Sequence, residues 1–87
     1  MLNVYFAPWC PHSQKTQEFL KENGIEFNPI DVETLPESMR NRIIEVNGGE
    51  NLVVPTLEYE GQWRPGKAFM AEELKADLKK MGVIMNE

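Results

Sequence analysis

Residues Leu2 to Ser13 read Leu-Asn-Val-Tyr-Phe-Ala-Pro-Trp-Cys-Pro-His-Ser, a short apolar run followed by a turn and the start of a helix. Val, Tyr and Phe favour extended backbone, so residues 2–6 predict a buried strand. Pro8 and Pro11 bar a helix before Cys10, whereas Pro11 itself suits the first helical position, where a missing N–H costs nothing. We therefore expect Cys10 at the beginning of a helix that runs from about Pro11 to Asn23.

The position of Cys10 at a helix start has chemical consequences. The first backbone N–H groups of a helix have no intrahelical partner and together carry about half a positive charge. Such a site stabilises a thiolate, which is the species that attacks disulfides. Because Pro11 has no N–H, we expect the amides of His12 and Ser13 to be the ones that stabilise the thiolate. A lone cysteine is otherwise usually a small buried hydrophobic residue, and its setting here favours the reactive role.

The rest of the chain predicts an α/β fold. Pro29 predicts an edge position or an irregular start for the second strand, and Trp63 is expected to pack within a hairpin that turns at Glu60-Gly61. The order βαβαββα predicts a mixed four-stranded sheet flanked by helices, in one domain that covers residues 1–87. Further strands are expected at residues 25–32, 52–59 and 62–64. A second helix is expected from Leu35, with Thr34 and Glu37 as a capping box, and a last helix from Met70 or Ala71 to Met81.

Composition argues against several classes of function. A net charge of −5 disfavours a nucleic-acid binder, since phosphate recognition needs clustered Lys and Arg. No apolar run approaches the ~20 residues of a membrane helix. The N-terminus lacks the features of a signal peptide, so we expect a cytoplasmic protein. A single Cys and a single His exclude an internal disulfide and a tetrahedral zinc site built from such ligands within one chain.

Two segments carry a resemblance to a known family. Residues Ala7 to Ser13 resemble the active-site loop of the thioredoxin superfamily, and Cys-Pro-x-Ser resembles its glutaredoxin branch. Val53-Val54-Pro55-Thr56 is similar to the family's Thr-Val-Pro, where the proline peptide is cis. The resemblance implies a thioredoxin fold in which Val54 and Pro55 face Cys10 and offer backbone groups to an extended peptide such as glutathione.

The resemblance also implies an activity, that of a thiol–disulfide oxidoreductase with Cys10 as its nucleophile. Glutathione would be the cosubstrate, glutathionylated or disulfide-containing proteins the partners, and the chain a monomer. Dithiol members have a second cysteine where this chain has Ser13, so only a monothiol route remains; a serine hydroxyl there can hydrogen-bond the Cys10 thiolate. The other candidates for substrate contact beside the cysteine are Trp9 as an apolar wall, Pro11, and His12 at the family's usual tyrosine position.

Departures from the family pattern leave alternatives open. The basic residue before the cysteine is absent, and the segment after the hairpin reads Pro65-Gly66-Lys67-Ala68 instead of Gly-Gly with a following Asp. Lys67 is a candidate for a glutathione carboxylate, although a solvated loop lysine is the simpler interpretation. One alternative function is an iron–sulfur module, in which a cysteine from each of two subunits and two glutathiones ligate a [2Fe–2S] cluster. Others are a dithiol electron donor to ribonucleotide reductase with Ser13 replacing its second cysteine, and a scaffold with an unreactive Cys10.

Overall fold

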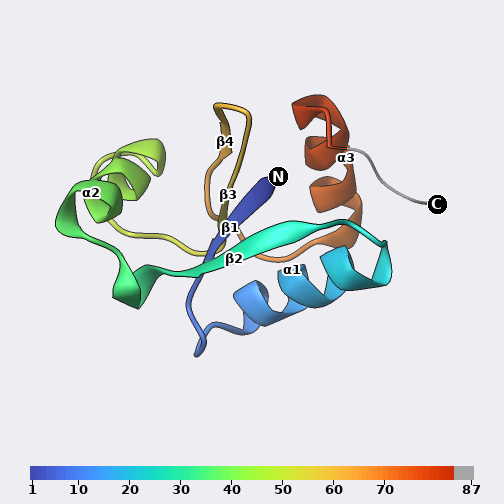
Figure 1. Cartoon of the computed structure of the whole chain (residues 1–87), viewed down its shortest axis with the longest axis horizontal. Helices are drawn as coiled ribbons and strands as arrows, with labels where there is room; N and C mark the ends of the chain where they lie inside the picture. Colours follow the sequence, from blue (N-terminus) through green and yellow to red (C-terminus); the bar gives the residue numbers. More distant parts are fainter. Residues whose placement is uncertain (84–87) are drawn as a thin grey trace.

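The fold is a four-stranded mixed sheet with three α-helices, seen in a computed structural model that describes residues 1–83 (Figure 1). The strand order is β2-β1-β3-β4, with β1 parallel to β2 and antiparallel to β3, and β3 antiparallel to β4. This is the predicted sheet. Its elements are β1 (Leu2–Phe6), α1 (Pro11–Glu22), β2 (Phe27–Asp31), the 3-10 helix η1 (Val32–Thr34), α2 (Glu37–Val46), β3 (Thr56–Tyr59), β4 (Gln62–Arg64) and α3 (Ala71–Met81).

The helices lie on both faces of the sheet, and each face has its own core. Helices α1 and α3 share one face, while α2 packs on the other (Figure 1). Alternation along β1 divides its side chains between the two, with Val4 in the first core and Tyr5 in the second. The second core also contains Cys10, so the cysteine belongs to the layer between the sheet and α2. Within residues 1–83, no helix has the length and apolar character to cross a membrane.

The second strand is shorter than the sequence predicts. It spans Phe27–Asp31 instead of residues 25–32, because Ile25 N–H donates to Leu20 O to close α1, and Val32 already belongs to η1. The edge position predicted from Pro29 is confirmed, since β2 pairs with β1 alone and Pro29 lies opposite Val4. A proline is tolerated there because an edge strand needs no donor on its outer side.

The predicted capping box at Thr34 and Glu37 is wrong. Thr34 lies in η1, and its Oγ1 donates to Asp31 O at 2.8 Å. Helix α2 begins at Glu37 after an N-cap at Pro36, and no side chain caps it. The physical reason is a separate short turn before α2: the Asp31 carboxylate accepts from Glu33 N–H at 2.9 Å and caps η1, which contains Thr34.

The third strand begins later than predicted, at Thr56 instead of residue 52. Pro55 cannot donate to a ladder, and the Val54-Pro55 peptide bond is cis, as the resemblance implied. The following hairpin turns at Glu60 and Gly61, whose φ angles of 48° and 85° are those of a tight two-residue turn. The last helix, Ala71–Met81, ends at Gly82 in the left-handed region, as its sequence predicts.

Candidate active site

Cys10 lies between the end of β1 and the start of α1, as the N-cap residue of that helix. Its N–H donates to Ala7 O at 3.1 Å, and its carbonyl accepts the first intrahelical bond, from Gln14 N–H at 3.1 Å. The amides of His12 and Ser13 precede that bond and so belong to the unpaired first turn. The first turn of α1, which the structure describes in full, carries no acidic residue. Among the described residues, the Cys10 side chain makes no capping hydrogen bond, so the predicted contact of the sulfur with the amides of His12 and Ser13 is not made in the structure.

The sulfur of Cys10 faces the Val54 carbonyl across the site. Its Sγ lies 3.9 Å from Val54 O, within reach of a weak S–H donor. Cys10 is 7% exposed, so most of the residue packs in the core shared with Tyr5, Ala7 and α2. The structure thus brings together Cys10, Val54 and the cis Pro55, as the family resemblance implies.

The Ser13 hydroxyl has a different hydrogen-bond partner from the predicted one, the Cys10 sulfur. It is fully buried, and its Oγ accepts from Ala7 N–H at 3.4 Å. This bond ties the first turn of α1 to the residue that follows β1. Its hydroxyl therefore stabilises the loop that carries Cys10. Within residues 1–83, its hydrogen-bond partner is the Ala7 amide and not the Cys10 sulfur.

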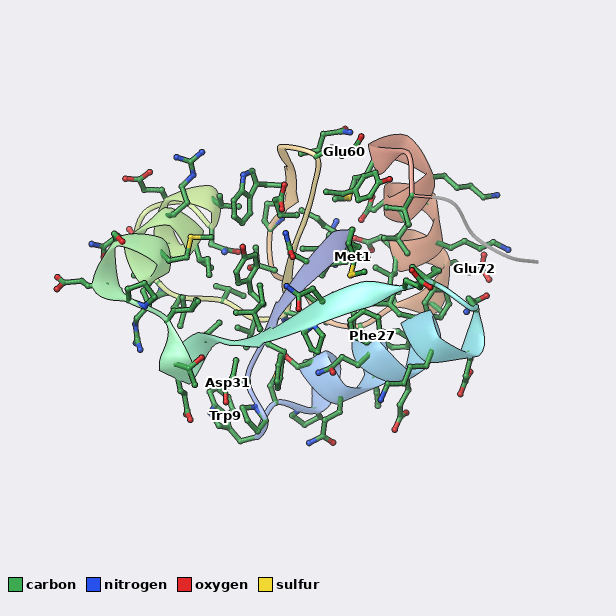
Figure 2. The ribbon with its side chains drawn as sticks, viewed as in Figure 1. Met1, Trp9, Phe27, Asp31, Glu60 and Glu72 are labelled. Carbon is green, nitrogen blue, oxygen red and sulfur yellow. The ribbon has the colours of Figure 1, made fainter. Side chains whose placement is uncertain are left out.

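Trp9, Pro11 and His12 form the outer border of the site. Trp9 projects from the loop before α1 and is 70% exposed (Figure 2), with its Nε1 donating to Glu33 Oε1 at 3.2 Å. Pro11 is the exposed first residue of α1. His12 Nδ1 accepts from Phe69 N–H at 3.0 Å, so that ring nitrogen carries no proton and the side chain connects α1 to the segment before α3.

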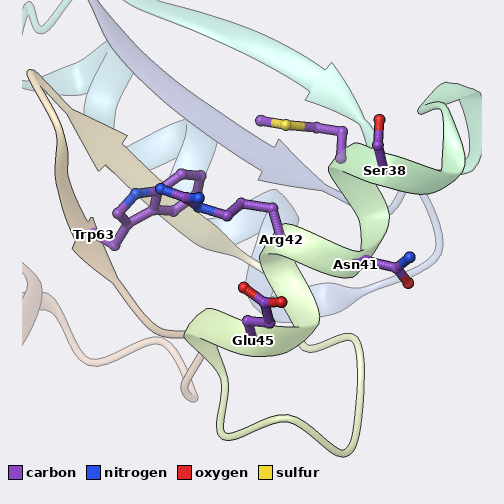
Figure 3. A pocket seen from close by; sticks show the side chains of 6 residues that line it. Ser38, Asn41, Arg42, Glu45 and Trp63 are labelled. Carbon is purple, nitrogen blue, oxygen red and sulfur yellow. The ribbon is translucent and has the colours of Figure 1, made fainter.

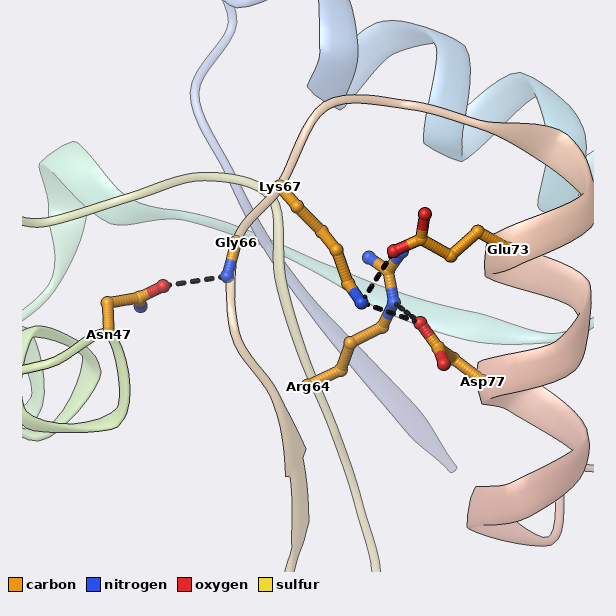
Figure 4. A network of polar contacts seen from close by, with 6 residues as sticks. All are labelled: Asn47, Arg64, Gly66, Lys67, Glu73 and Asp77. Carbon is orange, nitrogen blue, oxygen red and sulfur yellow. Dashed lines mark hydrogen bonds and ion pairs between the residues drawn. The ribbon is translucent and has the colours of Figure 1, made fainter.

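Lys67 is held in ion pairs instead of standing free in a loop. Its Nζ lies 2.7 Å from Glu73 Oε1 and 3.1 Å from Asp77 Oδ2, both on α3 (Figure 4). Asp77 also pairs with the buried Arg64 at 2.8 Å. Lys67 stays 40% exposed, so it is a solvated loop lysine that also makes surface ion pairs. To meet a glutathione carboxylate, its ammonium would have to share or leave these partners.

The same contacts shift two pKa values. The hydrogen bonds to Glu73 and Asp77 raise the pKa of Lys67 above its ordinary value, because they favour the charged ammonium. Burial acts to raise the pKa of Asp77, but the hydrogen bonds from Arg64 and Lys67 outweigh it, so the pKa of that carboxyl is lowered. The segment between β4 and α3 is therefore fixed to α3 through charged groups.

A set of hydrogen bonds that joins Asn47 to Thr56 and Gly66, next to Val53 and Val54, was not predicted. Asn47, the C-cap residue of α2, donates from Nδ2 to Thr56 Oγ1 at 3.0 Å and accepts from Gly66 N–H at Oδ1 at 2.7 Å (Figure 4). Thr56 Oγ1 in turn donates to Val53 O at 2.7 Å. In the sequence, Asn47 before Gly48-Gly49 indicates the end of a helix and nothing more, because its long-range partners leave no local signal.

A shallow cleft of about 480 Å³ lies beside the site, between α2 and β4 (Figure 3). The Arg42 guanidinium lies over the Trp63 ring, 6.0 Å from its centroid, and Trp63 stacks on Tyr5 at 5.7 Å. That stack places Trp63 against β1, outside the hairpin within which it is expected to pack. Burial, with the nearby charge of Glu58, raises the pKa of Tyr5.

Among residues 1–83, no group of three or more His, Cys, Asp or Glu side chains is placed to hold a metal ion.

Comparison with known proteins agrees with this architecture. A sequence model of the glutaredoxin family matches residues 2–63, which include Cys10, Val54 and Pro55. An uncharacterised glutaredoxin-like 8.6 kDa protein in the rubredoxin operon of Clostridium pasteurianum is 31% identical over 62 residues, covering 70% of this chain and 77% of its own.

Solved structures show the same fold. The glutaredoxin grx-1 of Archaeoglobus fulgidus is 28% identical, with a TM-score of 0.63 over 86% of this chain and 82% of its own. A buckwheat glutaredoxin, crystallised as a complex with glutathione, is 17% identical and shares the fold, with a TM-score of 0.70 over 95% of this chain and 80% of its own. The family match and the mixed four-stranded sheet agree, and the chain belongs to the glutaredoxin family.

Proposed function

We propose that this protein is a glutathione-dependent oxidoreductase that reduces mixed disulfides by a monothiol route with Cys10 as its nucleophile. The observation that carries the proposal is the setting of Cys10, at the N-terminus of α1 and 3.9 Å from Val54 O across the cis Pro55 segment. Membership of the glutaredoxin family supports thiol–disulfide exchange as the class of reaction. The buckwheat structure supports glutathione as the ligand of a protein with this fold.

The first step is attack by the Cys10 thiolate on the glutathionyl sulfur of a protein–glutathione mixed disulfide. The disulfide bond breaks, the substrate leaves as a thiolate that takes a proton from water, and Cys10 is left joined to glutathione. The unpaired amides of α1 stabilise the attacking thiolate, and the backbone groups of Val54 align the extended glutathionyl peptide beside it. The substrate protein is thereby reduced.

The second step returns Cys10 to its thiolate. A second glutathione thiolate attacks the sulfur of the bound glutathionyl group, which forms glutathione disulfide and releases Cys10. Each cycle therefore consumes one free glutathione, and the other half of the glutathione disulfide is the glutathionyl group taken from the substrate. Ser13 has no thiol, and Cys10 is the sole cysteine of the 87 residues, so no second cysteine of this chain competes for this step. We place this cycle in the cytoplasm, whose glutathione pool keeps thiols reduced.

The test is glutathione-dependent reduction of the mixed disulfide between glutathione and β-mercaptoethanol, by the wild type and Cys10→Ala. We expect turnover in the wild type and none in the variant. Absence of wild-type turnover would contradict the proposal. A coloured dimer after anaerobic reconstitution with iron, sulfide and glutathione would then favour the cluster-binding alternative, and turnover gained in Ser13→Cys would favour the dithiol donor.

A further inference from the structure

The side chain of Asn47 does more than cap a helix. Its Nδ2 donates to Ile43 O at 2.8 Å, which closes the last turn of α2. The same cap is made at the end of α1, where Asn23 Nδ2 donates to Phe19 O at 2.8 Å. In the part of the chain that the structure describes, the Asn23 side chain bonds within its own helix, whereas Asn47 also reaches two other segments.

These two long-range bonds join segments that meet behind the site. Asn47 Nδ2 contacts Thr56 Oγ1 at 3.0 Å, at the start of β3, and Oδ1 accepts from Gly66 N–H at 2.7 Å, in the loop after β4 (Figure 4). Thr56 is fully buried, so its hydroxyl has few alternatives to these protein partners. One amide side chain therefore sets the separation between the start of β3 and the loop at Gly66.

The chain of contacts continues to the sulfur. Thr56 Oγ1 donates to Val53 O at 2.7 Å, and the next carbonyl along the chain, Val54 O, lies 3.9 Å from Cys10 Sγ. Gly66 approaches the same valine closely, since a Cβ on Gly66 would lie 2.5 Å from Val53 Cγ1. The residues before the cis proline are thus clamped between Thr56 and Gly66, and Asn47 holds both.

We propose that Asn47 is a positioning residue, which acts through Thr56 and Gly66 to set Val54 against Cys10. This inference rests on the proposed function. The backbone of Val54 must lie at one distance from the sulfur if it is to align a disulfide for in-line attack. Rates of such reactions are sensitive to misplacement, and about 1 Å can cost as much as a hundredfold. Attack on a small, unaligned reagent needs no such alignment.

The test compares Asn47→Ala with Asn23→Ala, which removes a matching helix cap and leaves the clamp intact. Two rates are measured for each, well below the unfolding transition: kcat/KM for the glutathione mixed disulfide, and alkylation of Cys10 by iodoacetamide. We expect Asn47→Ala to lose about tenfold in kcat/KM while its alkylation rate stays within about twofold of the wild type. Asn23→Ala should retain both rates. Equal losses in the two variants, or an unchanged kcat/KM in Asn47→Ala, would overturn the inference.

Asn47→Asp and Thr56→Val test the route of the effect. Asp keeps an acceptor for Gly66 N–H but loses the donor to Thr56, so we expect it to lose activity as Asn47→Ala does. Combined with Thr56→Val, Asn47→Ala should lose less than the product of the two single losses, because both break one chain of bonds. Additive losses would contradict that route.

A second readout separates this inference from the proposed function. If the wild type shows no turnover, amide NMR shifts of Val54 and Cys10 still report the clamp. We then expect shifts at Val54, Gly66 and Cys10 in Asn47→Ala and none there in Asn23→Ala. Unchanged amide shifts at Val54 and Cys10 in Asn47→Ala would contradict the positioning role, whether or not the wild type shows turnover.

Discussion

Gly66 lies so close to Val53 that a Cβ on the glycine would fall 2.5 Å from Val53 Cγ1 and 3.0 Å from the Val53 carbonyl carbon. The need for glycine here comes from this close approach and not from a special backbone conformation. Gly66→Ala must push Val53 aside, and Val53 precedes the residue that faces Cys10. We expect a loss of about 1–3 kcal/mol in the free energy of unfolding, together with a lower kcat/KM, measured by urea denaturation and the glutathione assay.

The control for this variant is the double substitution Gly66→Ala with Val53→Ala. Removing the two Val53 methyl groups opens the space that the new methyl group needs. The Gly66→Ala change should then cost less in the Val53→Ala background than in the wild type. An equal cost in both backgrounds would show that the clash with the Val53 side chain is not the cause.

Ser13→Ala tests whether Ser13 braces the site loop. Its Oγ accepts from Ala7 N–H at 3.4 Å in a fully buried position, so the alanine leaves that donor without its side-chain acceptor. We expect the free energy of unfolding to fall by about 1–2 kcal/mol, measured by urea denaturation. Unchanged stability with a large loss of turnover would instead place the serine hydroxyl at the Cys10 thiolate.

Asp77→Asn tests the charged contacts between the loop and α3. Asp77 accepts from Arg64, which is 5% exposed, and removing the carboxylate leaves that buried guanidinium without its counter-charge. We expect a loss of about 1–3 kcal/mol near neutral pH. Glu73→Gln is the matched control: its pair with Lys67 is exposed, at 40% and 43%, so its loss should stay below about 1 kcal/mol.

The effect of Asp77→Asn should depend on pH in one direction. The pKa of Asp77 is lowered in the fold, so its ionised form stabilises the protein above the ordinary value of about 4. That contribution is lost as the pH falls through the lowered pKa. The difference in unfolding free energy between wild type and variant should therefore be full near neutral pH and shrink as the pH falls below the ordinary value of about 4. A difference that stays constant as the pH is lowered well below that value would contradict the role of the charge.

Trp9→Ala tests the outer wall of the site. Trp9 is 70% exposed, so its removal should change the free energy of unfolding by no more than about 0.5 kcal/mol. If the indole contacts substrate beside Cys10, KM for the mixed disulfide should rise several-fold while kcat changes little. The measurement is steady-state kinetics at varied disulfide concentration. A KM equal to that of the wild type would remove Trp9 from the substrate-binding residues.

Much of the fold could be predicted because its signals are local. The short run of Val, Tyr and Phe placed β1, the proline pair placed the start of α1, and the last predicted helix ended at Met81 as α3 does. The resemblance, and not the residue pattern, indicated the cis bond before Pro55. The capping box failed because Asp31 starts a separate 3-10 turn, in which the Thr34 hydroxyl donates to Asp31 O instead of capping α2.

The parts of the site that could not be predicted depend on contacts across the fold. Asn47 meets Gly66, and Lys67 meets Asp77, through side chains whose direction is set by the packing of α2 and α3. Neither pair has a fixed spacing that a sequence pattern would reveal. A helix-ending asparagine and a loop lysine are ordinary residues until the sheet brings their partners beside them.

The loop between β4 and α3 is tied down at both ends by residues from other elements. Asn47 of the α2 cap holds Gly66 N–H, and His12 of α1, two residues after Cys10, holds Phe69 N–H. Under the proposed function, a ligand bound beside Cys10 would meet a loop that is already fixed and would not have to order it. Little conformational entropy would then be lost on association, and product release would not wait for this loop to open.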